Sequence, residues 1–315
     1  MLKEFKKALS NSKNYQNITK KLWRYFFFLM IGIVVFLFMV KVGLFGKMPD
    51  IEELENPKTN LASEVYSADK ILMGKYYYEN RANCEFKELP TNLVNALIAT
   101  EDIRFRQHSG VDIKALTRAI VFLGKDGGAS TITQQLAKNL FHSRSTFLPA
   151  RILQKLKEMI IAIELERQYT KDEIVMLYFN TVPFGGSSFG IKSASKTFFS
   201  KEPKKLVIQE SALLVGMLKG STLYNPVRNP DKAISRRNIV LLQMNKYDFI
   251  SNEEFNSAKA KPLGLKISVQ NQNEGIAPYF RDYLRESLSI WCKSRLSLIH
   301  ISEPTRLRRI SYAVF

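Results

Sequence analysis

The sequence is poor in the side chains that most often bind metals or form disulfides. It holds two cysteines, Cys84 and Cys292, and three histidines, His108, His142 and His300. The cysteines lie far apart, neither has a second cysteine at a metal-binding spacing, and the histidines form no HExxH or similar cluster. The pattern therefore gives no indication of a zinc site.

Acidic residues are scarce relative to basic ones. The 315 residues include 29 Asp and Glu against 47 Lys and Arg, which gives a formal net charge of +18 and a pI of about 9.7. This composition fits a nucleic-acid-binding protein, a membrane-surface protein or an enzyme of anionic substrates. The hydrophobic content of 45% is enough for one sizeable globular domain with smaller pieces.

Charge is absent from Tyr25 to Val40, and the apolar run resumes after Lys41 as far as Gly46. A membrane-spanning helix needs roughly 20 such residues. Basic residues precede the run and acidic residues follow it, so the positive-inside rule predicts a cytoplasmic tail (1–24), a single-pass anchor (25–46) and an extracytoplasmic body. A cleaved signal peptide is the competing interpretation, although Lys41 to Met48 offers no small-x-small cleavage site. Export argues against a nucleic-acid partner and favours anionic lipid or phosphate.

The remainder divides into three parts. Residues 47–88 form a stalk in which Glu64 to Tyr78 ("EVYSADKILMGKYYY") predicts a β-hairpin. Helical periodicity then dominates until about Met244, which predicts a mainly α domain over residues 89–250. Residues 251–294 read as a linker, with a short polar helix over Asn252–Lys259 and an extended stretch over Pro262–Pro278.

Glu101 interrupts an apolar helical stripe. Leu93, Leu97 and Glu101 follow one another at i, i+4 and i+8 in "LVNALIATEDIRFRQHSG". Burial beside Leu97 and Ile98 would suit this carboxyl group to proton transfer near neutral pH. A solvated helix-end acid, or one paired with Arg104, is the equally weighted alternative.

Two further segments combine a helix with cations. In "GGASTITQQLAKN", Thr131 and Gln134 predict a capping box, with Gln134, Gln135 and Lys138 on the polar side of a helix whose N-terminus could bind phosphate. The alternative is a well-capped surface helix.

In "RILQKLKEMIIAIELERQ", the predicted core stripe is Leu156, Met159, Ile160 and Ile163. Arg151, Lys155 and Glu158 share another face. Taken alone, Glu158 reads as an ion-pair partner of Lys155 or Lys157, and such a pair is worth little if exposed.

The motifs in this order resemble one known family. "EDxxFxxHxG", "GxSTxTQQxxKN", a basic helix ending in Glu, "YxN…FG" and "LLVGMxKG…YNPxRNPxxAxxRR" are together similar to the peptidoglycan glycosyltransferase (family 51) domain of bifunctional class A penicillin-binding proteins, over about Glu64 to Met244. The resemblance implies a lysozyme-like fold facing the membrane and inverting polymerisation of lipid II into β-1,4-linked glycan strands, with release of undecaprenyl pyrophosphate. It also implies a bacterial inner-membrane location and contacts with lipid II, the growing strand and other cell-wall synthesis and division proteins.

The resemblance assigns roles residue by residue. Glu101 matches the catalytic base and Glu158 the family's second glutamate, while the cations would neutralise the departing pyrophosphate. No organic cofactor is implied; a divalent cation such as Mg²⁺, or the basic residues in its place, would serve the pyrophosphate. The residues expected to bind substrate are Asp102, Phe105, His108, Gly110, Ser130, Thr131, Gln134, Gln135, Lys138, Asn139, Arg151, Lys155, Lys157, Asn180 and Arg236.

One position departs from the family pattern. The third motif usually reads Arg-Lys-x-x-Glu, but Gln154 stands in place of the arginine. Arg151 or Arg144 could substitute for it, and the sequence does not decide between them. On the preceding helix, "DIKALTRAIVFLGK" places Leu116, Ala119, Ile120 and Leu123 on one stripe, which we interpret as a membrane-contacting face rather than an ordinary core helix.

Two other functions compete with polymerisation. A lytic muramidase of similar fold would use a buried glutamate but needs no cations around a pyrophosphate, and a non-catalytic cell-wall scaffold would not depend on Glu101. A transpeptidase would need Ser-x-x-Lys, Ser-x-Asn and Lys-Thr-Gly motifs. Ser193 to Lys196 ("SASK") fits the first motif, but it lies inside the glycosyltransferase pattern and no Lys-Thr-Gly follows.

The final residues have a different character. Leu296 to Arg306 is similar to the in-frame translation of a transposase-type sequencing-library adapter, and Ile310 to Phe315 is similar to its continuation. We therefore expect residues 295–315 to be an artefact, and the native chain to continue past about Ser294 into a transpeptidase domain.

Overall fold

Helices build almost all of the structure, a computed structural model that describes residues 2–44, 63–76, 80–81, 83–122, 128–141, 148–185, 188–268 and 277–295. The mainly α class predicted from the sequence is confirmed. The helices are α1 (Leu2–Lys41), α3 (Thr91–Glu101), α4 (Ile113–Val121), α5 (Ile132–Phe141), α6 (Leu148–Gln168), α7 (Lys171–Thr181), α8 (Ile191–Phe199), α9 (Ile208–Met217), α10 (Pro230–Lys246), α11 (Asn252–Ala260) and α12 (Pro278–Arg295). Short 3₁₀ turns cover Phe86–Glu88, Phe105–Gln107 and Pro203–Lys205. The tail from Leu296 to Phe315 lies outside the described residues.

The predicted hairpin is present. Strands β1 (Ser63–Tyr66) and β2 (Leu72–Tyr76) pair antiparallel, with an irregularity in register between Val65 and Tyr66. Lys70 closes the connection with φ of 62°, a left-handed conformation that suits a tight turn. A second pairing joins β3 (Asn80–Arg81) in parallel to β4 (Ser188–Phe189), so the end of the stalk is tied to the helical body.

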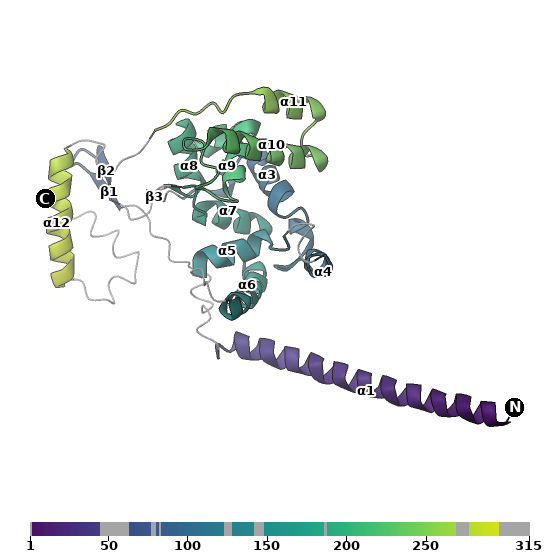
Figure 1. The fold of residues 1–315 in the computed structure, drawn as a ribbon. Helices are drawn as coiled ribbons and strands as arrows, with labels where there is room; N and C mark the ends of the chain where they lie inside the picture. The colour runs from purple at the N-terminus through teal and green to yellow at the C-terminus, as the bar shows by residue number, and fades with distance from the viewer. Residues whose placement is uncertain are drawn as a thin grey trace.

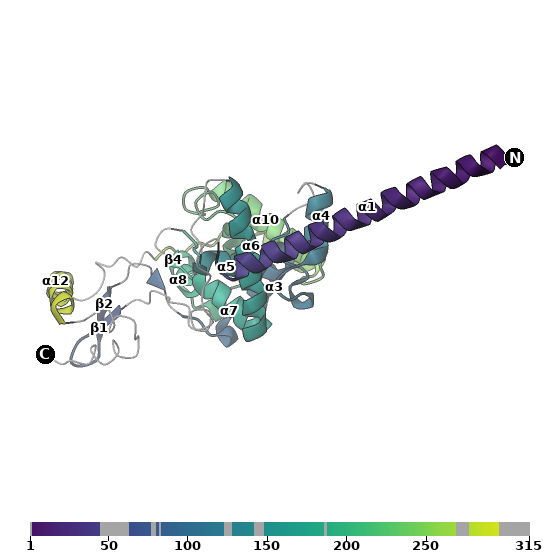
Figure 2. The same cartoon turned by 90° about the horizontal axis from the view of Figure 1, so that it is seen from below.

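Helix α1 extends away from the body, as Figures 1 and 2 show. Its segment Ile18–Val40 is 23 residues long and apolar enough to cross a membrane, by length and composition. Side chains such as Phe28 and Phe38 are exposed along it. Only its end meets the body, where Val40 is buried and α1 contacts α6.

The core forms around α9, which α3 and α10 flank. Every residue from Glu210 to Met217 is buried, as expected of a helix that is apolar on all sides. Against it, α3 buries Leu93 and Leu97 completely. The stripe predicted for α3 is therefore confirmed, and it ends on Glu101.

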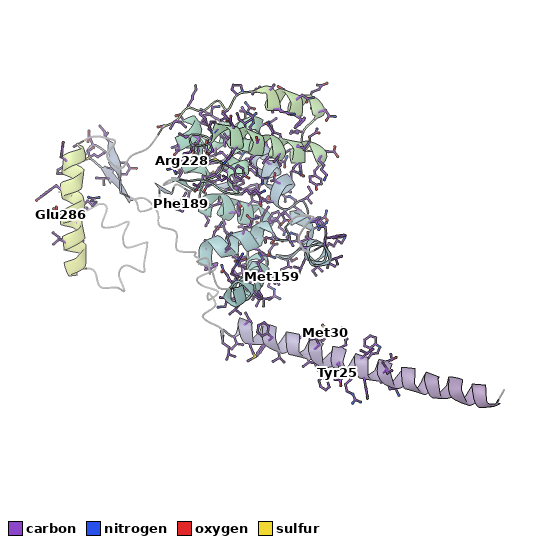
Figure 3. The ribbon with its side chains drawn as sticks, in the orientation of Figure 1. Tyr25, Met30, Met159, Phe189, Arg228 and Glu286 are labelled. Carbon is purple, nitrogen blue, oxygen red and sulfur yellow. The ribbon has the colours of Figure 1, made fainter. Side chains whose placement is uncertain are left out.

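The core stripe predicted for α6 is wrong. Ile161, Ala162 and Leu165 are buried, whereas Ile163 is 38% exposed, because α6 packs on α5 and α7 through that other face. The sequence of α6 is apolar on two sides, and the neighbouring helices select one of them. Figure 3 shows Met159, a member of the predicted stripe, on the side of the body from which α1 extends.

Helix α11 belongs to the packed body rather than to a linker. It contacts α10 and α9, and the fully buried Arg237 donates to the carbonyls of Lys259 and Lys261 at its C-terminal end, at 2.9 and 2.7 Å. Beyond α11 the chain is extended as predicted, and Lys266 N–H donates to Phe198 O. The packed body thus continues past residue 250, the boundary expected from the sequence.

Candidate active site

Glu101 is the last residue of α3. Asp102 leaves the helical conformation, with φ −159° and ψ 78°, so the Glu101 side chain projects from the helix end. Its Oε2 accepts a hydrogen bond of 2.9 Å from Gln135 Nε2, and its Oε1 lies 3.9 Å from Arg236 Nη2. The side chain is 18% exposed. Arg104 is not its partner, because Arg104 Nε donates to Asp112 Oδ2 at 2.8 Å, so the predicted pairing with Arg104 is wrong.

Gln135 joins Glu101 to the interior. Its Oε1 accepts a hydrogen bond of 3.0 Å from the hydroxyl of Tyr178 on α7. Burial, and secondarily the charge of Glu101, raises the pKa of Tyr178 well above its usual value. Tyr178 therefore remains a protonated donor at physiological pH.

Arg236 reaches the site from α10. The residue is 9% exposed. Its Nε is buried and has no hydrogen-bond partner among the described residues. A Cβ on Gly216 would lie 3.2 Å from Arg236 Cγ, so the glycine leaves room for this side chain. A buried guanidinium with an unused donor is suited to an anion.

Asp102, the second acid of the "ED" pair, has a structural role. Its Oδ2 accepts from Ile132 N–H at 3.1 Å and lies 3.0 Å from His108 Nε2, so it caps the N-terminus of α5 and holds His108. Phe105 is fully buried, packs edge-on against His108 and lies under Lys171 Nζ. These contacts give Asp102, Phe105 and His108 a structural role that needs no contact with substrate.

Gly110 lets α6 approach the loop that contains it. Its φ is +85°, and a Cβ there would lie 2.7 Å from the carbonyl carbon of Ala162. Its own carbonyl accepts from Thr131 Oγ1 at 2.7 Å and from Gln134 Nε2 at 3.3 Å.

Only half of the predicted capping box therefore forms. Gln134 N–H donates to Thr131 Oγ1 at 3.2 Å, but the Gln134 side chain bonds to Gly110 instead of turning back. Gln134 is fully buried, so its prediction as part of a polar face is wrong.

Glu158 lies in a second cluster, on α6. Its Oε2 is 3.1 Å from Lys155 Nζ, its Oε1 accepts from Gln154 Nε2 at 3.3 Å, and Lys155 Nζ also donates to Ser130 Oγ at 2.8 Å. The predicted ion pair with Lys155 is therefore confirmed, and because the Glu158 side chain is only 6% exposed, its carboxylate end is buried rather than solvated. Gln154 itself contacts Glu158.

Helix α5 stands between the two carboxylates. Ser130 precedes it and bonds to the Glu158 cluster, while Gln135 on its second turn bonds to Glu101. Lys138 and Asn139 follow Gln135 by one turn on the same face and are half-buried. The Lys138 side chain makes no hydrogen bond or ion pair within the described part of the chain.

The remaining candidates are Lys157, Arg151, Arg144 and Asn180. Lys157 is buried on α6, whereas Arg151 is exposed; Arg144 lies outside the described residues. Asn180 holds the backbone of Cys84: Asn180 Nδ2 donates to Cys84 O at 2.9 Å, and Cys84 N–H donates to Asn180 Oδ1 at 3.0 Å. Both ends of this amide are occupied by a structural contact, so we do not retain Asn180 as a substrate-binding residue.

The Cys84 thiol that Asn180 helps to hold is free and buried. Burial raises the pKa of Cys84 to about 12, which keeps it protonated and unreactive. Across the described residues, no group of three or more His, Cys, Asp or Glu side chains could hold a metal ion. The described side chains therefore do not form a resident metal cage.

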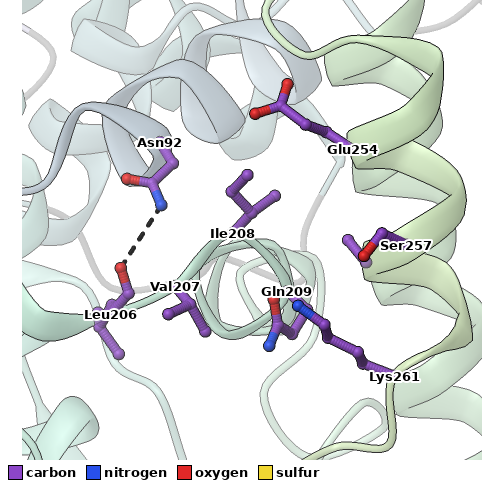
Figure 4. A pocket seen from close by; sticks show the side chains of 9 residues that line it. Asn92, Leu206, Val207, Ile208, Gln209, Glu254, Ser257 and Lys261 are labelled. Atoms are coloured by element: carbon purple, nitrogen blue, oxygen red, sulfur yellow. Dashed lines mark hydrogen bonds between the residues drawn. The ribbon is translucent and has the colours of Figure 1, made fainter.

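A cavity of about 360 Å³ lies elsewhere, between α9, α11 and the start of α3 (Figure 4). Its lining includes Asn92, Ile208 and Lys261, and Asn92 Nδ2 donates to Leu206 O across one edge. None of the candidate residues described above lines it.

Several known proteins are similar to this chain in sequence. Residues 69–245 match the family model described as Transglycosylase. The chain is 33% identical over 275 residues to Penicillin-binding protein 1A of Pseudomonas aeruginosa, covering 86% of this chain and 33% of that protein. It is 41% identical over 213 residues to Penicillin-binding protein 1F of Bacillus subtilis, covering 66% and 29%.

Among solved structures, the crystal structure of Penicillin-Binding Protein 1A from Haemophilus influenzae aligns with a TM-score of 0.44 and 20% identity, over 77% of this chain and 26% of that chain. The chain spans about a third of the length of the curated relatives it matches. By the match over residues 69–245, it belongs to the transglycosylase family.

Proposed function

We propose that this chain polymerises lipid II into β-1,4-linked glycan strands and releases undecaprenyl pyrophosphate. The observation that carries the proposal is the environment of Glu101, whose Oε2 is held by a neutral amide while its Oε1 faces a buried arginine at 3.9 Å. A general base needs a positioned carboxylate that is not locked in a close ion pair.

The proposed reaction is a single displacement. Glu101 takes the proton from the 4-hydroxyl of lipid II as that oxygen forms a bond to C1 of the growing strand's terminal sugar. The bond between C1 and the pyrophosphate oxygen breaks, and its electron pair leaves with undecaprenyl pyrophosphate. One base acting on one face gives inversion, from an α-linked donor to a β-1,4 product.

The leaving group carries the negative charge, so cations must stabilise it. Lys138, Lys155 and Arg236 are the proposed partners, and the unused Nε of Arg236 supports this assignment. A bound Mg²⁺ would add charge neutralisation, and it is usually held by one or two carboxylates together with substrate phosphates. The steps proposed here use the side-chain cations alone.

The proposed location is the bacterial inner membrane, with α1 spanning it and the body outside the cytoplasm. The basic residues ahead of α1 support this orientation. Of the stripe predicted on α4, Leu116 and Ala119 are only partly exposed, and the side chains of Ile120 and Leu123 lie outside the described residues. The apolar Ile113, Val121 and Phe122 on and just beyond α4 are instead more than half exposed, and α6 contacts α1. Both helices would thus bring the site toward lipid II in the bilayer, and other cell-wall synthesis proteins would meet the chain there.

Product analysis tests the function against a lytic muramidase. The purified chain in detergent is incubated with fluorescent lipid II, and in parallel with preformed glycan strands. The proposal expects long strands from lipid II that lysozyme digests, with none from Glu101→Gln. Release of fragments from glycan, without polymer from lipid II, would establish the muramidase instead, and polymer formed equally by Glu101→Gln would remove Glu101 from the mechanism.

A further inference from the structure

We infer that Tyr178 is a positioning residue for Glu101 and acts through the amide of Gln135. The inference rests on the proposed function, because it concerns the oxygen that takes the substrate proton. Three helices supply the three members of this chain of hydrogen bonds: Tyr178 from α7, Gln135 from α5 and Glu101 from α3.

The first step is the state of the phenol. Tyr178 is 1% exposed, and its pKa is raised by burial, so the hydroxyl stays protonated and can donate. The hydrogen bond to Gln135 Oε1 is 3.0 Å long, within the range of a well-formed bond. The phenol is therefore a fixed donor inside the core.

The second step is the direction of the amide. A glutamine side chain has an acceptor end and a donor end, and it can turn over unless its surroundings distinguish them. The Tyr178 hydroxyl takes the acceptor end of Gln135, so the NH₂ end faces Glu101, at 2.9 Å from Oε2. With the amide reversed, two oxygens would face each other and repel the carboxylate.

The third step is that the two oxygens of Glu101 have different partners. Oε2 is occupied by Gln135, whereas Oε1 has only the longer approach of Arg236 at 3.9 Å. Among the described residues, Arg236 from α10 is the cation within 4 Å of this carboxylate, and the charge of Glu101 acts on Tyr178 from α7. The geometry therefore assigns proton transfer to Oε1, with Oε2 as the fixed end.

A purely structural role for Tyr178 makes a different prediction. Its ring packs edge-on against Phe179 with centroids 5.9 Å apart, and a core residue could owe its presence to that packing alone. In that case Tyr178→Phe, which keeps the ring, would leave turnover unchanged. If Tyr178 acts through Gln135, the loss of one hydroxyl must reach the reaction.

Steady-state polymerisation of lipid II by the full chain in detergent decides between these roles. Tyr178→Phe should lower kcat about tenfold, the effect of losing one hydrogen bond, with KM changed less than twofold. The separate effects on kcat and KM are the readout, because a residue that only packs in the core would change neither. Tyr247→Phe, a tyrosine that also packs against the core, is the matched control and should match the native chain in both.

Gln135→Met tests the route. It should show the same losses as Tyr178→Phe, and the double variant should lose no more than either single one. Fully additive losses, or a native kcat in Tyr178→Phe, would overturn the inference while an active native chain keeps the proposed function. If Tyr178→Phe melts at much lower temperature than the native chain, Gln135→Met alone supplies the same readouts at a half-buried position.

A readout without turnover separates the two proposals. In the NMR spectrum of the native chain, the Gln135 side-chain NH₂ should show contacts to Glu101, and these should be lost in Tyr178→Phe but kept in Tyr247→Phe. A native chain that makes no polymer yet shows this pattern would refute the proposed function and leave the orienting role in place. Unchanged NH₂ contacts in Tyr178→Phe would refute the orienting role.

Discussion

The two candidate glutamates, one on either side of α5, are held in opposite ways. Glu158 has a lysine at 3.1 Å, a hydrogen bond from Gln154, and a side chain that is 6% exposed. Glu101 is 18% exposed, has a neutral amide on one oxygen, and has its nearest cation at 3.9 Å. Glu101 ends α3, whereas Glu158 lies inside α6, so the two carboxylates differ both in backbone position and in partners.

The difference teaches which carboxylate can exchange a proton. The close ion pair and the amide of Gln154 occupy both oxygens of Glu158. A carboxylate with one free oxygen near solvent can accept a proton and release it. We therefore interpret Glu101 as the base and Glu158 as the anchor that holds Lys155 against Ser130.

The largest effect is expected for Glu101→Gln. Loss of the base should reduce polymerisation by about 10³-fold, within the range usual for a general base. The glutamine is of similar volume and can still accept from Gln135, so the melting temperature should change little. Gel analysis of strands made from lipid II and a circular dichroism melt test both parts. Near-native turnover in Glu101→Gln would contradict the assignment of Glu101 as the base.

Glu158→Gln should have a smaller effect. Lys155 would keep its charge but lose the partner that holds it, and a charge-assisted contact of this kind corresponds to a loss of about 10- to 100-fold in kcat/KM. Lys155→Met is the complementary variant, and it should also lower the melting temperature, because it leaves the buried Glu158 without its cation. Equal losses of kcat/KM in Glu101→Gln and Glu158→Gln would contradict the assignment of different roles to the two carboxylates.

The sequence predicts some of this arrangement and misses the rest for identifiable reasons. The stripe of Leu93 and Leu97 that ends at Glu101 depends on helical periodicity alone, and it is confirmed. On α6 the periodicity is ambiguous, because Leu156 and Ile161 lie on different apolar faces and only contact with α5 and α7 selects the second. A local pattern contains no information about that neighbour.

Long-range hydrogen bonds account for the other misses. Gln134 is buried because the carbonyl of Gly110, 24 residues away, accepts its amide, and Asn180 is committed to Cys84, 96 residues away. The family motifs mark these residues equally with Glu101, and they do not separate residues that build the site from those that touch substrate. The sequence offers one signal here, the glycine at position 110, because glycine adopts a positive φ without steric cost and so points to backbone geometry.

Asn180→Ala tests a second pair of residues, on α7, where Tyr178 bonds to Gln135 of the site and Asn180 bonds to the backbone of Cys84. Two hydrogen bonds to the Cys84 backbone are lost, one of them from a partly buried N–H, so we expect a loss of about 2 kcal/mol in stability. Turnover of the folded protein should fall less than twofold. Thermal melting in detergent, together with kcat at a temperature well below the melt, measures both. A native melting temperature with a large rise in KM would return Asn180 to the substrate-binding set.

The smallest effect concerns a third carboxylate, Asp112, which is committed wholly to structure. Burial alone would raise its pKa, but hydrogen bonds from Arg104 and from Ala115 N–H, with the charge of Arg104, hold the pKa below its usual value. Asp112 precedes α4 and caps it through the 2.9 Å bond to Ala115 N–H. Asp112→Ala should therefore cost about 1 kcal/mol at pH 7.

The pH dependence of that cost follows from the direction of the shift. Because the pKa is lower in the folded chain than in the unfolded one, the stabilisation is present above the ordinary aspartate pKa of about 3.9 and is lost as the pH falls through the folded value. The gap in melting temperature between the native chain and Asp112→Ala should thus be constant from pH 7 to about pH 5 and close below about pH 4. Asp112→Asn, which keeps an acceptor for Ala115 N–H but carries no charge, should lie between the two at pH 7 and should show no such closing of its gap to Asp112→Ala. A gap between the native chain and Asp112→Ala that stays constant down to pH 3 would mean that Asp112 stabilises α4 by its shape and not by its charge.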